Sequence, residues 1–155
     1  MKLADIFTRE TIVPELKAAT KKDAIEEMVS TLVKAKLVSQ AQSGDLLAAL
    51  VRREEIGSTG IGRGVGVPHV KHPCASRIIG VFARSSKGIE FNALDGGPVY
   101  IVFMLVSPPD CVEPHLKTLK KVSALTSDND FRRFLINAKD CSELVELMKE
   151  ADERL

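Results

Sequence analysis

Apolar residues recur along this chain with two different periods, and these periods divide it into helical and extended segments. Apolar positions at spacings of three and four over residues 21–36 predict an amphipathic helix, with Thr20 as its N-cap. A second helix is predicted from an N-cap at Ser43 to Glu55, where a run of four charges of mixed sign is typical of a solvated helix end. Three further helices are predicted over residues 112–126, 129–137 and 141–153.

The extended segments lie mainly between the second and third of these helices. Residues 99–106 are the most apolar stretch, and their length and β-branched content favour a central strand. An almost continuous apolar run within residues 77–83 predicts a strand that is covered on both faces. Shorter strands are predicted at residues 11–13, at 65–68 and, at a sheet edge, at 88–94. Helices, then strands, then helices predict an α/β fold with a mixed β-sheet flanked by helices on both faces.

Length and composition narrow the class of protein. The 155 residues suit a single domain, residues 1–155, and 45% apolar residues suffice for one core. The 22 basic and 21 acidic residues balance, and the chain has no Trp and one Tyr, which argues against a nucleic-acid binder. No apolar stretch approaches about 18 residues, and the N-terminus lacks a signal-peptide core. Three scattered cysteines, Cys74, Cys111 and Cys141, indicate a reducing cytoplasm without a disulfide framework.

Glycines are concentrated in one stretch before a histidine. Five of the ten glycines fall within residues 57–66, and Val67, Pro68 and His69 follow. Glycine is favoured where the backbone takes positive φ or passes close to a neighbour, and proline fixes φ. The pattern therefore predicts a loop whose backbone shape presents His69 at the rim of the sheet with little side-chain bulk around it.

This stretch resembles the signature of the EIIA domains of the phosphoenolpyruvate-dependent sugar phosphotransferase system, of the fructose/mannitol and nitrogen-regulatory type. Gly66 stands where that family usually has Ala, and Val70 where it usually has Gly, Ala or Cys. Later blocks around Gly88, Val102 and His115 follow in the family's order, so the resemblance covers nearly the whole chain. It implies an α/β sandwich with a mixed sheet. The signature residues are Glu54, Ile61, Gly62, Val65, Gly66, Val67, Pro68 and His69.

The resemblance also implies roles for three residues. His69 would accept a phosphoryl group, because a neutral imidazole is a nucleophile near pH 7 when a carbonyl, here one of the loop, holds its other nitrogen. Arg53, sixteen residues earlier, corresponds to an active-site arginine, and its forked guanidinium suits phosphate oxygens. His115 corresponds to a second active-site histidine that contacts the phosphoryl group, at a helix start that Pro114 suits. Ser58, Thr59 and Gly60 are candidate donors to phosphate or to a partner.

The family's activity suggests two functions for the chain. In the first, phospho-HPr transfers its phosphoryl group to His69, which passes it to the EIIB domain of a sugar permease, in the cytoplasm and without a cofactor. In the alternative, the chain is a nitrogen-regulatory EIIA that signals its phosphorylation state by binding regulatory proteins, and the absence of an attached permease segment is compatible with this. A third hypothesis, an EIIA-like fold without phosphotransfer, conflicts with the intact His69 and His115.

Three other motifs are not supported by the spacing of their residues. His69, His72 and Cys74 have the spacing H-x2-H-x-C, but a zinc site would need a further ligand from Cys111 or His115, and no metal is expected. The alternating glycines lack the spacing of a dinucleotide-binding loop, and they follow a helix where that loop follows a strand. Residues 57–60 also do not match the Gly-x-Ser-x-Gly nucleophile motif.

Overall fold

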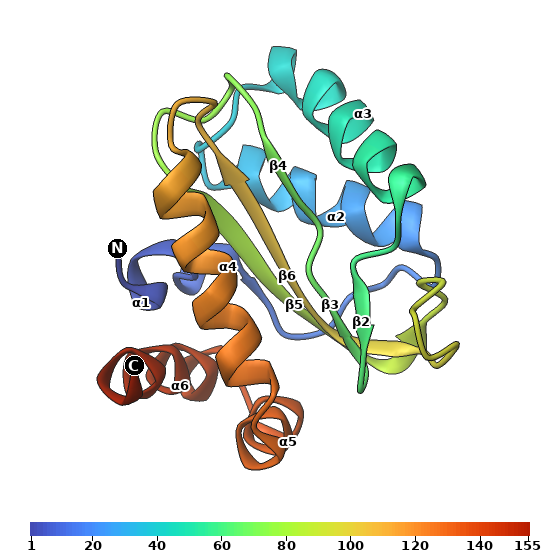
Figure 1. The fold of residues 1–155 in the computed structure, drawn as a ribbon, viewed down its shortest axis with the longest axis vertical. Helices are drawn as coiled ribbons and strands as arrows, with labels where there is room; N and C mark the ends of the chain where they lie inside the picture. Colours follow the sequence, from blue (N-terminus) through green and yellow to red (C-terminus); the bar gives the residue numbers. More distant parts are fainter.

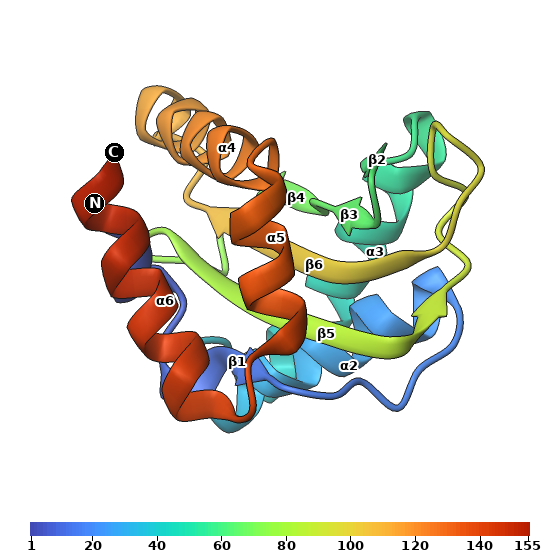
Figure 2. The same ribbon diagram turned by 90° about the horizontal axis from the view of Figure 1, so that it is seen from below.

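A mixed sheet of six strands lies between two layers of helices (Figures 1 and 2). The computed structural model describes residues 1–155. The strand order is β1-β5-β6-β3-β2, and β4 also pairs with β6. The predicted α/β class and mixed sheet are therefore confirmed. The strands are β1 (Ile12–Val13), β2 (Gly60–Gly62), β3 (Val65–Gly66), β4 (His69–Lys71), β5 (Ile79–Ile89) and β6 (Val99–Ser107).

Strand β6 is the centre of the sheet, as its apolar sequence predicted. It pairs antiparallel with β5 and parallel with both β3 and β4. The predicted strand at residues 65–68 is interrupted, so that β3 and β4 follow one another along the same edge of β6. Pro68 lies at the interruption, where it has no N–H to donate, and its carbonyl accepts a hydrogen bond from Leu105 N at 3.0 Å. This arrangement brings His69 alongside Leu105, near the end of β6.

The predicted edge strand at residues 88–94 is wrong. β5 is longer than expected and continues to Ile89, and beyond it Glu90 makes only an isolated bridge with Thr20. The chain then leaves the sheet, and the Phe91 side chain is fully buried in the core. The polar residues at 84–87 stay in β5 because the strand still pairs with β6 at Arg84 and at Ile89, on either side of an irregularity in the register.

Helices α2 (Lys21–Lys34) and α3 (Gln40–Ile56) cover one face of the sheet. Thr20 caps α2 as predicted, accepting from Asp23 N at 3.3 Å. The predicted start of the second helix is wrong, because Ser39 is its N-cap and Ser43 lies inside it. The opposite face is covered by α1 (Leu3–Ile6), α4 (Val112–Thr126), α5 (Asn129–Asn137) and α6 (Cys141–Arg154), and a 3-10 turn spans Arg9–Thr11.

The two faces of the sheet bury separate cores. Twenty buried apolar residues pack under α2 and α3, and nineteen pack under α1, α4, α5 and α6. The first and last helices lie side by side (Figure 1), and the Asp152 carboxylate accepts hydrogen bonds from Leu3 N at 2.7 Å and Ala4 N at 3.0 Å. None of the helices combines the length and the apolar character that crossing a bilayer requires.

Candidate active site

His69 begins β4, directly after the glycine-rich hairpin. Its half-buried ring is held by one short hydrogen bond, from Nδ1 to the carbonyl oxygen of Val67 at 2.7 Å. A carbonyl oxygen can only accept, so Nδ1 must carry the hydrogen. The neutral ring therefore has its lone pair on Nε2, the nitrogen farther from the backbone. The sequence predicted a loop carbonyl in this role, and Val67 supplies it.

His115 faces His69 from the first turns of α4. The two ring centroids are 5.7 Å apart and the ring planes are inclined by 49°. His115 is 3% exposed, and its Nδ1 lies 2.6 Å from the Oγ of Ser107, the last residue of β6. The His115 ring is thus held by two elements, because its backbone belongs to α4 and its Nδ1 contacts Ser107 at the end of β6.

Both imidazoles are neutral at pH 7. Burial lowers the pKa of His69, and the charges of Arg53 and Lys71 lower it further, against the opposing effects of the Val67 carbonyl and Glu54. Burial, together with the charges of His69 and Lys71, lowers the pKa of His115 to about 4. A neutral His69 keeps its Nε2 lone pair available for attack on an electrophile.

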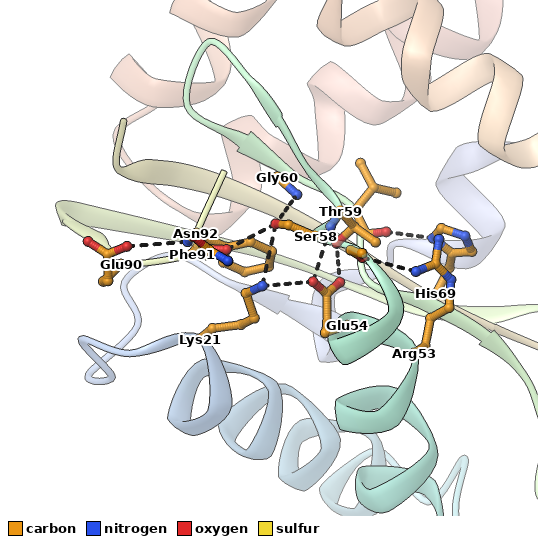
Figure 3. A network of polar contacts seen from close by, with 12 residues as sticks. Lys21, Arg53, Glu54, Ser58, Thr59, Gly60, His69, Glu90, Phe91 and Asn92 are labelled. Atoms are coloured by element: carbon orange, nitrogen blue, oxygen red, sulfur yellow. Dashed lines mark hydrogen bonds and ion pairs between the residues drawn. The ribbon is translucent and has the colours of Figure 1, made fainter. Parts of the chain in front are cut away.

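Arg53 comes to this site from the last turn of α3. Its Nη1 donates to the carbonyl oxygen of Gly57 at 3.0 Å, and the guanidinium lies beside the His69 ring (Figure 3). This contact curls the side chain over the helix end. The structure therefore brings together the three residues that the sequence selected, from α3, β4 and α4. A cation and a neutral imidazole next to a free ring nitrogen suit a transferred anionic group such as phosphoryl.

Ser58, Thr59 and Gly60 lie at the base of the hairpin, and their polar groups are engaged away from the imidazoles (Figure 3). Ser58 Oγ donates to the Phe91 carbonyl at 3.0 Å and accepts from Gly60 N at 3.1 Å. The Thr59 hydroxyl donates to Glu54, and Thr59 is 5% exposed. These contacts hold the loop in place, and they do not bring the two hydroxyls to His69.

Glu54 corrects the prediction of a solvated helix end. Its carboxylate is buried and pairs with Lys21 Nζ at 3.0 Å, because the last turn of α3 lies under the hairpin. Lys71 and Ser107 are further residues of the site that sequence reasoning missed. Lys71 carried a signal, since residues two apart in a strand share a face and His69 begins β4. Ser107 carried none, because its position depends on the register that pairs it with Lys71.

The hairpin explains one departure from the family signature. An added Cβ at Gly66 would lie 3.0 Å from two ring carbons of Phe91, so the buried aromatic ring takes the space that an alanine methyl would need. The hairpin turns through Arg63 and Gly64, with φ of 58° and 78°, which are the signs required by a type I′ turn.

The three assembled side chains line none of the five best-defined cavities of the molecule. Five cavities of about 290 to 530 Å³ lie elsewhere, the roomiest of them between α5 and α6. Val112 and Leu116, on either side of His115 in α4, are 50% and 51% exposed. The surroundings of His69 are thus an open surface with apolar side chains, a form that suits a protein surface better than an enclosed small molecule.

Several known proteins are similar to this chain in sequence and in fold. The nitrogen regulatory protein of Bradyrhizobium diazoefficiens is 34% identical over 96% of this chain and 95% of its own length. The fructose-specific EIIA component of Haloferax volcanii is 35% identical over 99% of this chain and 100% of its own length. The crystal structure of nitrogen regulatory protein IIA-Ntr from Neisseria meningitidis matches with a TM-score of 0.86 and 29% identity, covering 94% of this chain and 98% of that chain.

A family model confirms the resemblance that the glycine-rich stretch indicated. The model is described as "Phosphoenolpyruvate-dependent sugar phosphotransferase system, EIIA 2", and it matches residues 5–151. That range contains His69, His115 and Arg53 together with all six strands. The chain therefore belongs to the EIIA type 2 family of the phosphoenolpyruvate-dependent sugar phosphotransferase system.

Proposed function

We propose that this protein is a cytoplasmic phosphocarrier that receives a phosphoryl group on His69 from phospho-HPr and passes it to the EIIB domain of a sugar permease. The observation that carries the proposal is the hydrogen bond from His69 Nδ1 to the Val67 carbonyl, which leaves Nε2 free beside Arg53 and His115. Family membership supports the same chemistry, because the family takes part in phosphoryl transfer.

The transfer step needs only the nitrogen lone pair. His69 Nε2 forms a bond to phosphorus while the bond from phosphorus to the donor's imidazole breaks, and the donor keeps that electron pair. His69 then carries phosphoryl on Nε2 and hydrogen on Nδ1, so its ring is positively charged. The Val67 carbonyl, 2.7 Å from Nδ1, stabilises this charge through a stronger hydrogen bond.

Arg53 and His115 hold the phosphoryl oxygens in this proposal. The guanidinium of Arg53 has donors beyond the one that binds Gly57. If the Ser107 hydroxyl donates to His115 Nδ1, the neutral ring carries its hydrogen on Nε2 and can donate it to a phosphoryl oxygen. Both groups are in place before the partner docks, and preorganised donors of this kind are the main source of catalysis in phosphoryl transfer.

Labelling with [³²P]phosphoenolpyruvate, enzyme I and HPr tests the proposal. Wild type and His72→Gln should acquire an acid-labile phosphoryl group, whereas His69→Gln should not. His72 is the matched control because it lies outside the facing pair, where its Nδ1 accepts from Cys74 N at 3.1 Å. Equal labelling of His69→Gln and wild type would refute the assignment of His69 as the acceptor.

A regulatory function is the second candidate, and two observations favour it. The relative from Bradyrhizobium diazoefficiens and the structure from Neisseria meningitidis are both named nitrogen regulatory proteins. In this case the phosphorylation state of His69 would select among protein partners. Affinity capture with the phosphorylated and unphosphorylated forms separates the two functions. A regulatory protein should bind one form preferentially, whereas identical capture by both forms would contradict regulation.

A further inference from the structure

We propose that Glu54 is a positioning residue that fixes the tautomer of His69 from beneath the hairpin. The inference rests on the proposed function only in taking His69 as the phosphoryl acceptor. It assigns to a buried carboxylate the task of holding the Val67 carbonyl where the His69 ring needs it.

The Glu54 carboxylate makes three hydrogen bonds at the base of the loop. Its side chain is 4% exposed and pairs with Lys21 Nζ at 3.0 Å. Its Oε2 also accepts from Thr59 N at 3.1 Å, and its Oε1 accepts from the Thr59 hydroxyl. A carboxylate is costly to bury unless it is paired and hydrogen-bonded, and two of these three bonds go to Thr59. Glu54 therefore clamps Thr59 from both the backbone and the side chain.

Two further hydrogen bonds connect Thr59 with the imidazole. The Thr59 carbonyl accepts from Val67 N at 3.1 Å, and the Val67 carbonyl accepts from His69 Nδ1 at 2.7 Å. Thr59 and Val67 directly precede and follow the paired hairpin strands β2 and β3, so their bond closes the base of the hairpin. Figure 3 shows the carboxylate at one end of this chain of contacts and the His69 ring at the other.

The hairpin needs such an anchor because its own sequence is permissive. Gly62 and Gly64 both have positive φ, and an irregularity in the pairing interrupts the register between Gly60 and Gly62. If Thr59 is released, Val67 N loses its partner, and the Val67 carbonyl is held only through the contacts of its neighbours Gly66 and Pro68 with β6. His69 would then distribute its hydrogen between Nδ1 and Nε2, and the free lone pair would be on Nε2 in only part of the molecules.

The test reads the tautomer of the unphosphorylated protein by ¹⁵N NMR of its histidine rings. Wild type should show a protonated Nδ1 and an unprotonated Nε2 at His69. Glu54→Gln keeps the side-chain volume but loses the charge and one acceptor, and it should shift both ¹⁵N signals toward a mixture of tautomers. Glu55→Gln, the exposed neighbour in α3, is the matched control and should leave both signals unchanged.

A second variant covers the case in which Glu54→Gln fails to fold. Thr59→Val replaces the hydroxyl with a methyl group, keeps the ion pair between Glu54 and Lys21, and should shift the His69 signals in the same direction by a smaller amount. Unchanged His69 signals in folded Glu54→Gln, or in Thr59→Val if that is the only variant that folds, would overturn the proposal. Mixed signals in folded Glu54→Gln would support it, as would mixed signals in Thr59→Val if only that variant folds.

Phosphorylation by phospho-HPr adds a kinetic measurement that separates this inference from the proposed function. We expect Glu54→Gln to be labelled several-fold more slowly than wild type, in proportion to the fraction of molecules whose His69 Nε2 is unprotonated, and Glu55→Gln at the wild-type rate. If wild type itself is not labelled, the proposed function fails, while the NMR result still decides the role of Glu54. If Glu54→Gln is labelled as fast as Glu55→Gln, the tautomer does not limit transfer and the positioning role is refuted.

Discussion

Each of the two facing histidines has a single short contact from Nδ1, and the two contacts differ in chemistry. The Val67 carbonyl can only accept, so it decides the tautomer of His69. The Ser107 hydroxyl can donate or accept, so it allows His115 to present either a lone pair or a hydrogen on Nε2. One ring is thus held in a single tautomer with a free lone pair on Nε2, and the other can adopt either tautomer.

Arg53 is expected to influence His69 through its charge. The guanidinium lowers the pKa of His69, so the change Arg53→Gln should raise it and move the acidic fall in phosphorylation rate to higher pH. An NMR titration of the His69 ring protons measures the shift. Arg52→Gln is the matched control, because Arg52 is exposed and does not contribute to the His69 pKa. A midpoint that is the same in both variants contradicts the placement of Arg53 beside the ring.

His115 should make stability depend on pH in a defined window. Its pKa is about 4 in the folded protein and about 6.5 in the unfolded chain, so the unfolded state binds more protons between these values. The free energy of unfolding attributable to this group is therefore fully present above pH 6.5. It should fall by about 3 kcal/mol as the pH drops to 4.

Urea denaturation at several pH values, compared between wild type and His115→Asn, isolates this contribution. The variant should lose less stability than wild type between pH 6.5 and 4, because it lacks the buried group that must be protonated. Parallel curves for the two proteins would show that burial does not hold His115 neutral.

At the scale of single elements, two glycines should respond in opposite ways to the same added methyl. A Cβ at Gly80 in β5 would lie 2.6 Å from the Met104 carbonyl oxygen and 2.8 Å from the Phe7 ring, inside the sheet. Gly80→Ala should lower the free energy of unfolding by about 2 kcal/mol or more. Gly44 is exposed within α3 with nothing near its Cβ position, and Gly44→Ala should raise the free energy by about 0.5 to 1 kcal/mol.

Chemical denaturation of the two variants provides the comparison, and each protein serves as the control for the other. A Gly80→Ala protein as stable as wild type would mean that β5 and β6 can separate at this point without cost. A destabilised Gly44→Ala protein would contradict the exposed position of Gly44 in α3.

The elements show what the sequence could and could not predict. The period of three and four located α2, α4, α5 and α6 to within two residues, because each buries one stripe on the sheet. Local pattern failed where a distant partner decides the structure. The run of polar residues in β5 is strand because β6 pairs with β5 on both sides of it, and Glu54 is buried because the hairpin folds back over the end of α3. The family resemblance pointed to His69, His115 and Arg53 from the sequence. Ser107 was missed because its place in the site depends on the pairing of β6 with β4.

At the scale of the whole molecule, the two ends of the chain are joined at Asp152. Its carboxylate accepts from the first two backbone N–H groups of α1, and Lys121 in α4 donates to the Met1 carbonyl at 2.9 Å. Asp152→Asn should cost about 1 kcal/mol, as for loss of a helix cap, and should leave the His69 tautomer unchanged. Thermal unfolding and the ring ¹⁵N spectrum measure the two effects, with the neighbouring exposed Glu153→Gln as control.

A stability unchanged in Asp152→Asn would show that the terminal helices pack through apolar contacts alone. A changed His69 spectrum would show that the helical layer on this face of the sheet communicates with the hairpin, to which it is linked by a hydrogen bond from Arg63 Nη1 to the Ser127 carbonyl at 3.5 Å.

The single unprotonated nitrogen of His69 has a consequence for the order in which partners meet this protein. Under the proposed function, donor and recipient would each approach the same Nε2, so they would compete for one binding site and would not form a ternary complex. An excess of unphosphorylated recipient would then slow loading in the manner of a competitive inhibitor. The rate at which phosphoryl groups pass through the protein would therefore depend on the relative concentrations of the two partners as well as on the reactivity of the His69 ring.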